Sequence, residues 1–362
     1  MRGASHDLVV AGGGPAGLAT ALHAARAGLD VVVAEPRSAP IDKACGEGLM
    51  PGAVRALARL DLRVPGHPLT GIRYVQGDRR SHACFRDGGG LGARRTELHE
   101  VLHRAVLDAG VPVLPVRVGE VRQDATGVTL PGCGLRARWL AAADGLHSPL
   151  RRSLGLEVGT GAPPRYGLRR HYAVAPWTTA VEVHWGPHAE AYVTPLGRHL
   201  VGLSLLTSRR ASFDVQMADF PHLLDLLPPR AAVTAVRGAG PLRRRSRTRH
   251  HGRVLLVGDA AGYIDALTGE GVFLALVGAE ALVRNLCRGT PGRYETDWKR
   301  ATRRHRYLTE LLTAARRRPV LGSLIVPTAE RLPRLFAAAV NALAHDVGQD
   351  PARLGDGEAA AR

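Results

Sequence analysis

Apolar positions near the start of the chain repeat in the way that a strand, a helix and a second strand require. Leu8 to Ala11 form a short, uninterrupted apolar run, which is typical of a buried parallel strand. Pro15 stands at a helix-opening position, and alanine and leucine residues continue a helical pattern to Gly28, a common stop signal. A second strand is expected from Asp30 to Ala34. This order predicts a parallel sheet with helices packed on it.

Two later, separated parts of the chain continue this pattern. An amphipathic helix is expected over residues 95–110, and residues 111–130 alternate like antiparallel strands. A buried-strand pattern returns at residues 253–262, and a helix is expected to follow it over residues 271–286. One nucleotide-binding fold is therefore expected to be assembled from three separated pieces.

The stretch between the second and third pieces has a different pattern of apolar and polar residues. Residues 169–206 contain short β-rich runs broken by proline and glycine, which indicates an antiparallel sheet. After Trp298 the pattern is helical, with breaks expected at Pro319, Pro327 and Pro333, and the last dozen residues are expected to be frayed.

The fold class expected from these patterns is α/β, with a Rossmann-like domain built from discontinuous segments, an inserted antiparallel substrate domain and a helical C-terminus. We assign residues 1–65, 93–160 and 248–298 to the nucleotide-binding domain. Residues 66–92 and 161–247 are assigned to the β-rich domain, and residues 299–362 to the helical C-terminal segment.

Composition narrows the class of protein. The formal net charge is +17, and all but two of the 49 basic residues are arginine. No nucleic-acid recognition motif accompanies this charge, so no nucleic-acid partner is expected. The four cysteines stand far apart without metal-ligand spacing, which indicates a reduced, cytoplasmic protein with no metal site. No signal peptide or membrane-spanning stretch is expected.

A glycine-rich turn supplies the first candidate site. Gly12, Gly14 and Gly17 form GxGxxG between the first strand and helix, with Pro15 and Ala16 inside the motif. Such a turn lets the backbone approach a pyrophosphate at the positive end of a helix. Glu35 follows 18 residues after Gly17, at the end of the second strand, where a carboxylate can hold the hydroxyls of an adenosine ribose. We place Pro36 and Arg37 in the same site.

Two further segments identify the dinucleotide. VGDAAGYIDALTGEGV (residues 257–272) and ADGLHSPLRR (residues 143–152), together with the first turn, resemble the fingerprints of the para-hydroxybenzoate hydroxylase-like superfamily of flavoproteins. Within it, the DKACGEGLMP loop (residues 42–51) is most similar to the geranylgeranyl reductase-like branch. The resemblance implies FAD as cofactor, with NAD(P)H docking transiently as electron donor.

The same resemblance assigns roles to individual residues. It implies that Asp259 binds the ribityl chain of FAD, that Asp144 supports the pyrophosphate region, and that Arg95 opens the helix lying along the cofactor. Cys45 and Gly46 would pass the isoalloxazine ring. The remaining cofactor contacts that it implies are Gly258, Gly269, Gly271 and Val272.

Several reactions agree with this resemblance. Monooxygenation through a flavin C4a-hydroperoxide, on an apolar small molecule of secondary metabolism, is our first hypothesis, and reduction of a carbon–carbon double bond of the geranylgeranyl reductase type is the alternative. Flavin halogenation ranks third, because the chain lacks the Trp-x-Trp-x-Ile-Pro block of those enzymes. A flavin-binding carrier without enzymatic activity stays open as a non-enzymatic reading.

Catalytic and substrate contacts are expected from residues 42–51, which we call the thiol loop, and from the inserted sheet. Cys45 and His184 are the candidate catalytic residues, the histidine because its ordinary pKa lies near working pH. Tyr172, Trp185 and Tyr192 are the candidate substrate contacts. The substrate is expected to be free or carrier-bound, and the protein to be a monomer or homodimer. Packing of the C-terminal helices on their own domain is favoured over contact with a membrane surface.

Overall fold

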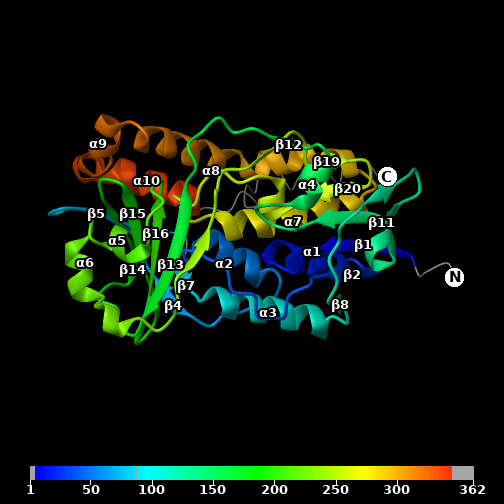
Figure 1. Cartoon of the computed structure of the whole chain (residues 1–362), viewed down its shortest axis with the longest axis horizontal. Helices are drawn as coiled ribbons and strands as arrows, with labels where there is room; N and C mark the ends of the chain where they lie inside the picture. The colour runs from blue at the N-terminus through cyan, green and yellow to red at the C-terminus, as the bar shows by residue number, and fades with distance from the viewer. Residues whose placement is uncertain (1–4, 87, 345–362) are drawn as a thin grey trace, which may run out of the picture.

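The computed structural model of the chain describes residues 5–86 and 88–344. A parallel sheet forms one end of the molecule, at the right of Figure 1. Its parallel strands lie in the order β20 (Val254–Leu256), β11 (Leu135–Ala142), β1 (Ser5–Ala11), β2 (Val31–Ala34) and β8 (Val113–Leu114). Antiparallel pairs extend it through β19 (His250–His251), β9 (Arg122–Gln123) and β10 (Val128–Leu130). The strand order brings three distant parts of the chain together, as expected from the sequence.

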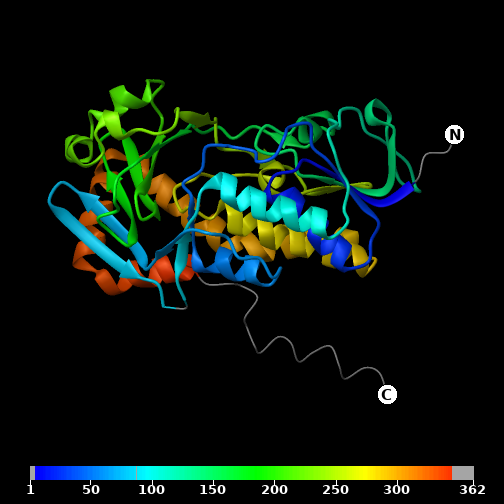
Figure 2. The ribbon, with the colours of Figure 1, turned by 90° about the horizontal axis from the view of Figure 1, so that it is seen from below.

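Helices cover this sheet and complete its core. Helix α1 (Pro15–Arg26) packs between α3 (Arg95–Asp108) and α7 (Gly271–Cys287), and Figure 2 shows this helical layer from below. Leu8, Val9 and Val10 are fully buried because β1 is covered on both faces. Two shorter helices, α2 (Pro51–Ala58) and α4 (Pro149–Ser153), complete this part.

A second, seven-stranded sheet forms the other end of the molecule (Figure 1). Its strand order is β17 (Arg237–Ala239), β13 (Tyr166–Tyr172), β16 (Leu200–Thr207), β15 (Ala189–Gly197), β14 (Ala180–Trp185), β5 (Gly71–Gln76) and β6 (Arg79–Cys84). Every neighbouring pair is antiparallel except β14 and β5, which run parallel. The sheet thus joins residues on both sides of the nucleotide-binding segments, although the domain boundaries assigned above stay a prediction.

Different helices cover the two faces of this second sheet. Helices α5 (Phe213–Met217) and α6 (Pro221–Leu226) pack on one face through Phe213, Phe220 and Leu223. On the other side, α9 (Pro319–Arg331) and α10 (Pro333–Ala344) pack on β5 and β6. Smaller pairings join the ends: β3 (Gly48–Leu49), β7 (Gly90–Gly92) and β4 (His67–Leu69) form one sheet, and β12 (Glu157–Val158) pairs with β18 (Arg245–Ser246).

The long helix α8 (Tyr294–Arg316) connects the two ends, since it contacts α7 as well as α9 and α10. The break expected at Pro327 is wrong, because this proline lies inside α9. Pro319 and Pro333 do begin helices, as a residue without a backbone N–H can. The frayed end expected for the last dozen residues lies outside the described residues. Within the described ranges, no helix combines the length and apolar character that crossing a membrane requires.

Candidate functional site: a cavity between the two sheets

A cavity of about 890 Å³ lies between the parallel sheet and the seven-stranded sheet. Its wall includes Gly14, Arg95 and Asp144 from the first part of the fold, and Val183 and Tyr192 from the second. This size lies in the range of sites that enclose cofactors and small molecules. The parts of the fold built on the two sheets therefore both contribute to one site.

The turn after β1 is shaped by close backbone contacts. Gly12 has a φ of +114°, and a Cβ on Gly17 would lie 1.8 Å from the Gly12 carbonyl oxygen. A Cβ on Gly14 would meet nothing within 4 Å, and Gly14 lines the cavity. Two of the motif glycines thus serve the tight turn, and the third keeps the approach to the helix end open.

A buried histidine of α3 is hydrogen-bonded to the backbone of this turn. His99 Nε2 lies 2.9 Å from the Gly13 carbonyl oxygen. Burial, and then the positive charge of Arg95, lowers the pKa of His99 to about 4. The imidazole is therefore neutral at pH 7, and it donates its Nε2–H to Gly13.

Glu35 ends β2 beneath the glycine turn. Gly13 N donates to its Oε2 at 2.8 Å, and the Arg37 side chain donates to both carboxylate oxygens. Burial opposes ionisation of Glu35, but the hydrogen bonds from Arg37 and Gly13 outweigh it and lower the pKa of the carboxyl. Glu35 is thus a carboxylate that fixes the turn, and Arg37 reaches from it to the cavity wall.

The polar atoms around this end of the cavity fit the diphosphate and ribose of FAD. Arg95 Nη1 and Asp144 Oδ1 are buried, and neither has a hydrogen-bond partner in the part of the chain that the structure describes. Both residues line the cavity beside the open glycine turn. A guanidinium suits a phosphate oxygen and a carboxylate oxygen suits a hydroxyl group. Arg95 and Asp144 would therefore hold FAD here together with backbone N–H groups of the turn.

The other two fingerprint segments are fastened to each other. The buried Arg151 side chain donates to the carbonyl oxygens of Leu146 and Ala260, which links the loop after β11 to the loop after β20. Asp259 accepts a 2.9 Å hydrogen bond from Lys43 Nζ across the cavity. Asp259, Gly269, Gly271 and Val272 all line the cavity at the N-terminal end of α7, where the helix dipole favours negative charge.

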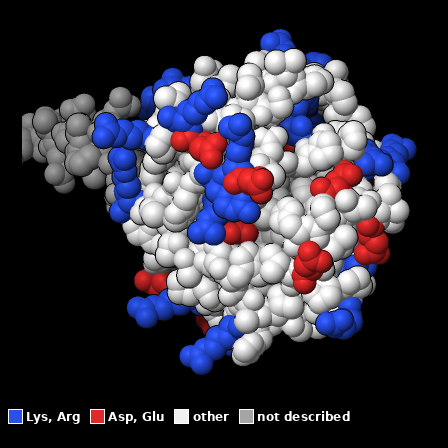
Figure 3. All heavy atoms as spheres, turned by 90° about the vertical axis from the view of Figure 1, so that its left-hand side faces the viewer, with Lys and Arg blue, Asp and Glu red and all other residues white. Residues whose placement is uncertain are grey.

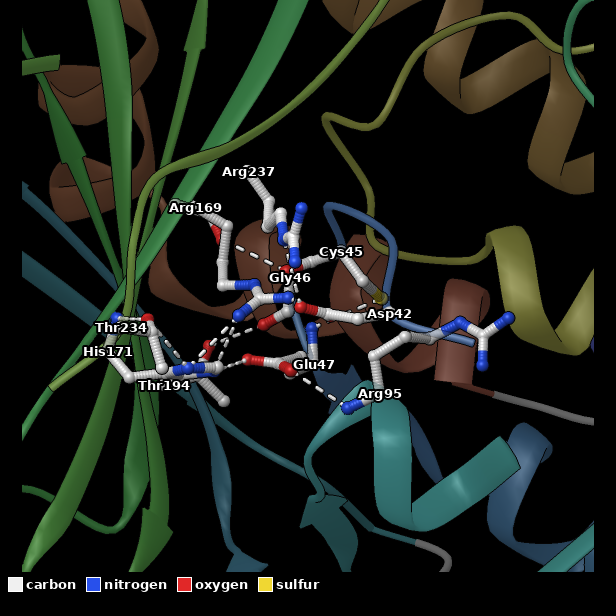
Figure 4. A network of polar contacts seen from close by, with 11 residues as sticks. Asp42, Cys45, Gly46, Glu47, Arg95, Arg169, His171, Thr194, Thr234 and Arg237 are labelled. Carbon is white, nitrogen blue, oxygen red and sulfur yellow. Dashed lines mark hydrogen bonds and ion pairs between the residues drawn. The ribbon is translucent and has the colours of Figure 1, made fainter. Parts of the chain in front are cut away.

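The thiol loop is held against the second sheet by side chains that the sequence did not single out (Figure 4). Ser204 Oγ donates to the Cys45 carbonyl oxygen at 3.1 Å, and Thr194 Oγ1 donates to that of Gly46 at 2.8 Å. Arg169 forms an ion pair with Asp42. The loop from Asp42 to Gly48 therefore has little freedom to change its position.

Glu47 is the central residue of this loop. Its φ is +59°, and its Oε1 accepts the backbone N–H of Arg95 at 2.8 Å. Its Oε2 lies 2.6 Å from His171 Nε2. Because Arg169 donates to His171 Nδ1 at 3.0 Å, the imidazole must donate from Nε2 to Glu47 (Figure 4).

Cys45 opens into the cavity from this loop. Exclusion of water, and then the nearby Glu47 carboxylate, raises the pKa of the Cys45 thiol. Glu47 N lies 3.4 Å from the sulfur. The thiol is therefore protonated at neutral pH, with the cofactor-facing Arg95 on one side and the second sheet on the other.

Strand alternation decides which predicted substrate residues reach the cavity. Val181 and Val183 of β14 and Tyr192 of β15 line it, and the Tyr192 hydroxyl donates to the Leu267 carbonyl oxygen at 2.9 Å. His184 lies on the opposite face, because neighbouring strand residues point to opposite sides. Its ring bonds to Glu182 and to His222 of α6, so the structure does not bring His184 to the cavity.

The other two aromatic residues are also set back from the cavity wall. Tyr172 packs in the apolar cluster covered by α5 and α6, at the end of β13 beyond the residues of this strand that line the cavity. Trp185 shares the cavity face but lies in the apolar cluster behind the wall, with its ring centroid 5.1 Å from that of Tyr74.

Most of the predicted cofactor residues line the cavity, and the others lie beneath or beside it. Those that line the cavity are Gly14, Pro15, Ala16, Arg37, Cys45, Gly46, Arg95, Asp144, Asp259, Gly269, Gly271 and Val272. Gly12, Gly17 and Glu35 shape the turn beneath it, Pro36 is exposed, and Gly258 lines a smaller adjoining cavity.

Comparisons with known proteins agree with this geometry. A family model described as an FAD binding domain matches residues 7–56. The chain is 30% identical to the menaquinone reductase of Mycobacterium tuberculosis, over 96% of this chain and 92% of the relative. It is 26% identical to digeranylgeranylglycerophospholipid reductase 1 of Methanothermobacter thermautotrophicus, over 75% and 74% of the two chains.

Hydroxylases and solved flavoproteins are similar as well. The identity to a 3-(3-hydroxy-phenyl)propionate/3-hydroxycinnamic acid hydroxylase of a Mycobacterium species is 28%, over 73% of this chain and 51% of the relative. A flavin-dependent halogenase matches 86% of this chain and 64% of its own with a TM-score of 0.76 at 19% identity. A geranylgeranyl bacteriochlorophyll reductase-like protein from Thermoplasma acidophilum matches 95% and 97% of the two chains with a TM-score of 0.75 at 19% identity. The structural likenesses show the fold alone.

Proposed function

Because this chain belongs to the para-hydroxybenzoate hydroxylase-like superfamily of FAD-dependent oxidoreductases, in its geranylgeranyl reductase-like branch, we propose that it reduces a carbon–carbon double bond in an apolar, isoprenoid-type chain. The reductase relatives support this proposal, since one of them matches nearly the full length of both chains. The hydroxylase relative matches only about half of its own length.

The observation that carries the proposal is the position of the Cys45 thiol in the cavity wall, where a polar wall meets an apolar one. Arg95, Asp144 and the glycine turn lie on the cofactor side of the cavity. Val181 and Val183 lie on the other side, and they suit a hydrocarbon chain. A thiol at this junction can give a proton to a carbon atom of a substrate that lies against the apolar wall.

The reaction requires one hydride equivalent and one proton for each double bond. Reduced FAD supplies the hydride equivalent when it is bound. The Cys45 S–H bond breaks as the new C–H bond forms at the second alkene carbon, and a solvent proton restores the thiol afterwards. Arg95, whose charge favours the thiolate, stabilises it in between. NAD(P)H as the source of electrons is part of the same proposal.

Product analysis under labelled oxygen gas tests the proposal. The purified holoenzyme is incubated with NAD(P)H and either menaquinone or a geranylgeranyl phospholipid, and the product is analysed by mass spectrometry. Gain of two hydrogen atoms in the isoprenoid chain without labelled oxygen is the expected result; any quinol is first reoxidised to the quinone, so that reduction of the ring is not counted. Incorporation of labelled oxygen, with every double bond retained or converted to an epoxide, would overturn it.

Monooxygenation stays the second candidate function, because the hydroxylase relative is nearly as similar per residue as the reductases. The same product analysis distinguishes the two reactions. The role in secondary metabolism that we inferred from the sequence stays a prediction.

A further inference from the structure

The C-terminal helices carry most of the exposed apolar side chains. Eleven large hydrophobic residues are exposed among residues 5–86 and 88–344, and seven of them lie between Tyr307 and Leu335. Tyr307 is 68% exposed, Leu311 56% and Val320 73%. A concentration of this kind marks an interaction surface, whereas single exposed apolar residues are ordinary.

Helical periodicity places these side chains on the exposed sides of two consecutive helices. Tyr307 and Leu311 are four residues apart in α8, on the side opposite to the buried residues Thr302, His305 and Thr309. Only Arg317 and Arg318 separate α8 from α9, whose exposed large apolar residues are Val320, Leu321 and Leu324. We call Tyr307, Leu311, Val320, Leu321 and Leu324 the apolar stripe.

Most of the charges beside the apolar stripe are positive; the exception is Glu310, which pairs with Arg243. Arg300, Arg303 and Arg304 precede Tyr307 at helical spacing on the exposed side of α8, and Arg317 and Arg318 follow Leu311. In the described part of the chain, Arg300, Arg303 and Arg304 make no ion pair with an acidic side chain.

The acidic residues of α8 are themselves paired with basic side chains. Glu295 pairs with Arg249 and Lys299, and Glu310 pairs with Arg243. Figure 3 shows the end of the molecule that carries α9. Acidic and basic side chains lie beside one another in the middle of that face, and its upper margin is basic or uncharged.

The helix that follows α9 lines the cavity. Val340 and Leu343 of α10 line it, and Val326 of α9 is buried in the apolar cluster behind Val181 and Val183. Figure 1 shows α8 and α9 along the upper margin of the molecule, above the second sheet. The apolar stripe therefore lies on helices that pack against α10, a helix of the cavity wall.

From these observations we infer that the apolar stripe and its arginines dock the protein on the surface of an anionic lipid bilayer. The apolar side chains enter the headgroup region, and the arginine heads pair with lipid phosphates while their stems lie along apolar surface. Each arginine near such a surface strengthens binding by about fivefold. The inference rests on the proposed function in one respect, that an isoprenoid-type lipid is collected from the bilayer, but docking itself needs no turnover.

Vesicle co-sedimentation tests the docking directly. The holoenzyme is mixed with vesicles of phosphatidylcholine alone or of phosphatidylcholine with phosphatidylglycerol. We compare the wild type with the double variants Tyr307→Ser/Leu311→Ser and Arg303→Glu/Arg304→Glu. The control is Val215→Ser/Leu226→Ser, which removes two apolar side chains of similar exposure from α5 and α6. All replaced residues are exposed, so bound FAD and circular dichroism should stay at wild-type values.

Wild type and control are expected to sediment with the anionic vesicles, and binding is expected to fall about tenfold or more in both test variants. Failure of the wild type to bind anionic vesicles would overturn the inference. So would an equal loss in the control, or full binding by Tyr307→Ser/Leu311→Ser, which would indicate adsorption by charge alone. Loss of self-association in that variant, measured by sedimentation velocity without vesicle binding by the wild type, would assign the surface to a second copy instead.

Activity separates this inference from the proposed function. The test variants should reduce a detergent-dispersed substrate at the wild-type rate and a vesicle-embedded one more slowly. If no protein reduces either substrate, the proposed function fails while the vesicle result still decides the docking.

Discussion

Cys45 stands where the cofactor-facing turn meets the apolar wall of the cavity, and the proposed reaction depends on its proton. Replacing Cys45 with alanine should lower kcat for alkene reduction by about a hundredfold or more, since a positioned general acid contributes about 10²–10⁴-fold. FAD affinity should change little, because Ala is smaller and adds no contact. Steady-state kinetics and FAD titration measure both quantities. Cys287→Ala, at an exposed thiol remote from the cavity, is the control; a wild-type rate in Cys45→Ala would remove the thiol from the mechanism.

The motif glycines offer a matched pair of substitutions. Gly17→Ala should destabilise the apo-protein by about 3 kcal/mol, because its Cβ would overlap the Gly12 carbonyl oxygen. Gly14→Ala should leave this stability unchanged and weaken FAD binding, since Gly14 has ordinary backbone angles and borders the cavity. Urea unfolding and FAD fluorescence titration measure the two effects. Equal behaviour of the two variants would contradict the division of roles.

How far single residues could be predicted depended on the distance to their partners. Gly12, Gly14 and Gly17 are recognisable because the turn and the strand and helix that it joins lie in one short segment of the chain. Lys43 and Asp259 are 216 residues apart, and His171 and Glu47 are 124 apart. Nothing local in the sequence indicates such pairs, so the network around Cys45 became visible only in the structure.

The loop from Asp42 to Gly48 acts as a unit fastened to β13, β15 and β16. Glu47→Gln should shift the alkylation midpoint of Cys45 to lower pH, because loss of a nearby negative charge favours the thiolate. The rate of iodoacetamide labelling against pH measures this midpoint. Glu330→Gln, an exposed residue paired with Arg79, should leave it unchanged. An upward shift in Glu47→Gln would reverse the electrostatic account.

For the strands of the second sheet, the sequence showed which residues share a face, but it did not show which face of the sheet lies toward the cavity. The sequence placed Tyr172, His184 and Tyr192 on β-like runs, and only Tyr192 reaches the cavity. The choice between faces is made by tertiary packing, because α5 and α6 cover one side of the sheet and the cavity lies on the other. Helix α9 continues through Pro327 for a related reason: packing of Val326 and Ala329 outweighs the local preference.

The cavity joins the two ends of the molecule, so its occupant should stabilise the whole fold. Added FAD should raise the Tm of the apo-protein, with about 2.7 kcal/mol of stabilisation at a concentration one hundred times the Kd. Thermal unfolding followed by circular dichroism over a series of FAD concentrations measures this effect. Adenosine alone, which lacks the flavin, should stabilise less, and an unchanged Tm with FAD would mean that the cavity does not hold it.

The order of the three fingerprints was sufficient to predict the discontinuous α/β fold, because each fingerprint belongs to a local strand–turn–helix unit. The seven-stranded sheet was foreseen only as antiparallel β-structure. Its parallel contact between β5 and β14 joins segments on either side of the second fingerprint and depends on the assembled fold.

A single-turnover experiment without oxygen tests the proposed reduction most directly. The holoenzyme is photoreduced under anaerobic conditions and mixed with a geranylgeranyl phospholipid, and the flavin spectrum and the lipid mass are followed together. Alkene reduction predicts that oxidised flavin returns without oxygen, one equivalent for each double bond lost. If the flavin stays reduced and the lipid unchanged until oxygen is admitted, and the lipid then gains oxygen, the enzyme is a monooxygenase and the proposed function is wrong.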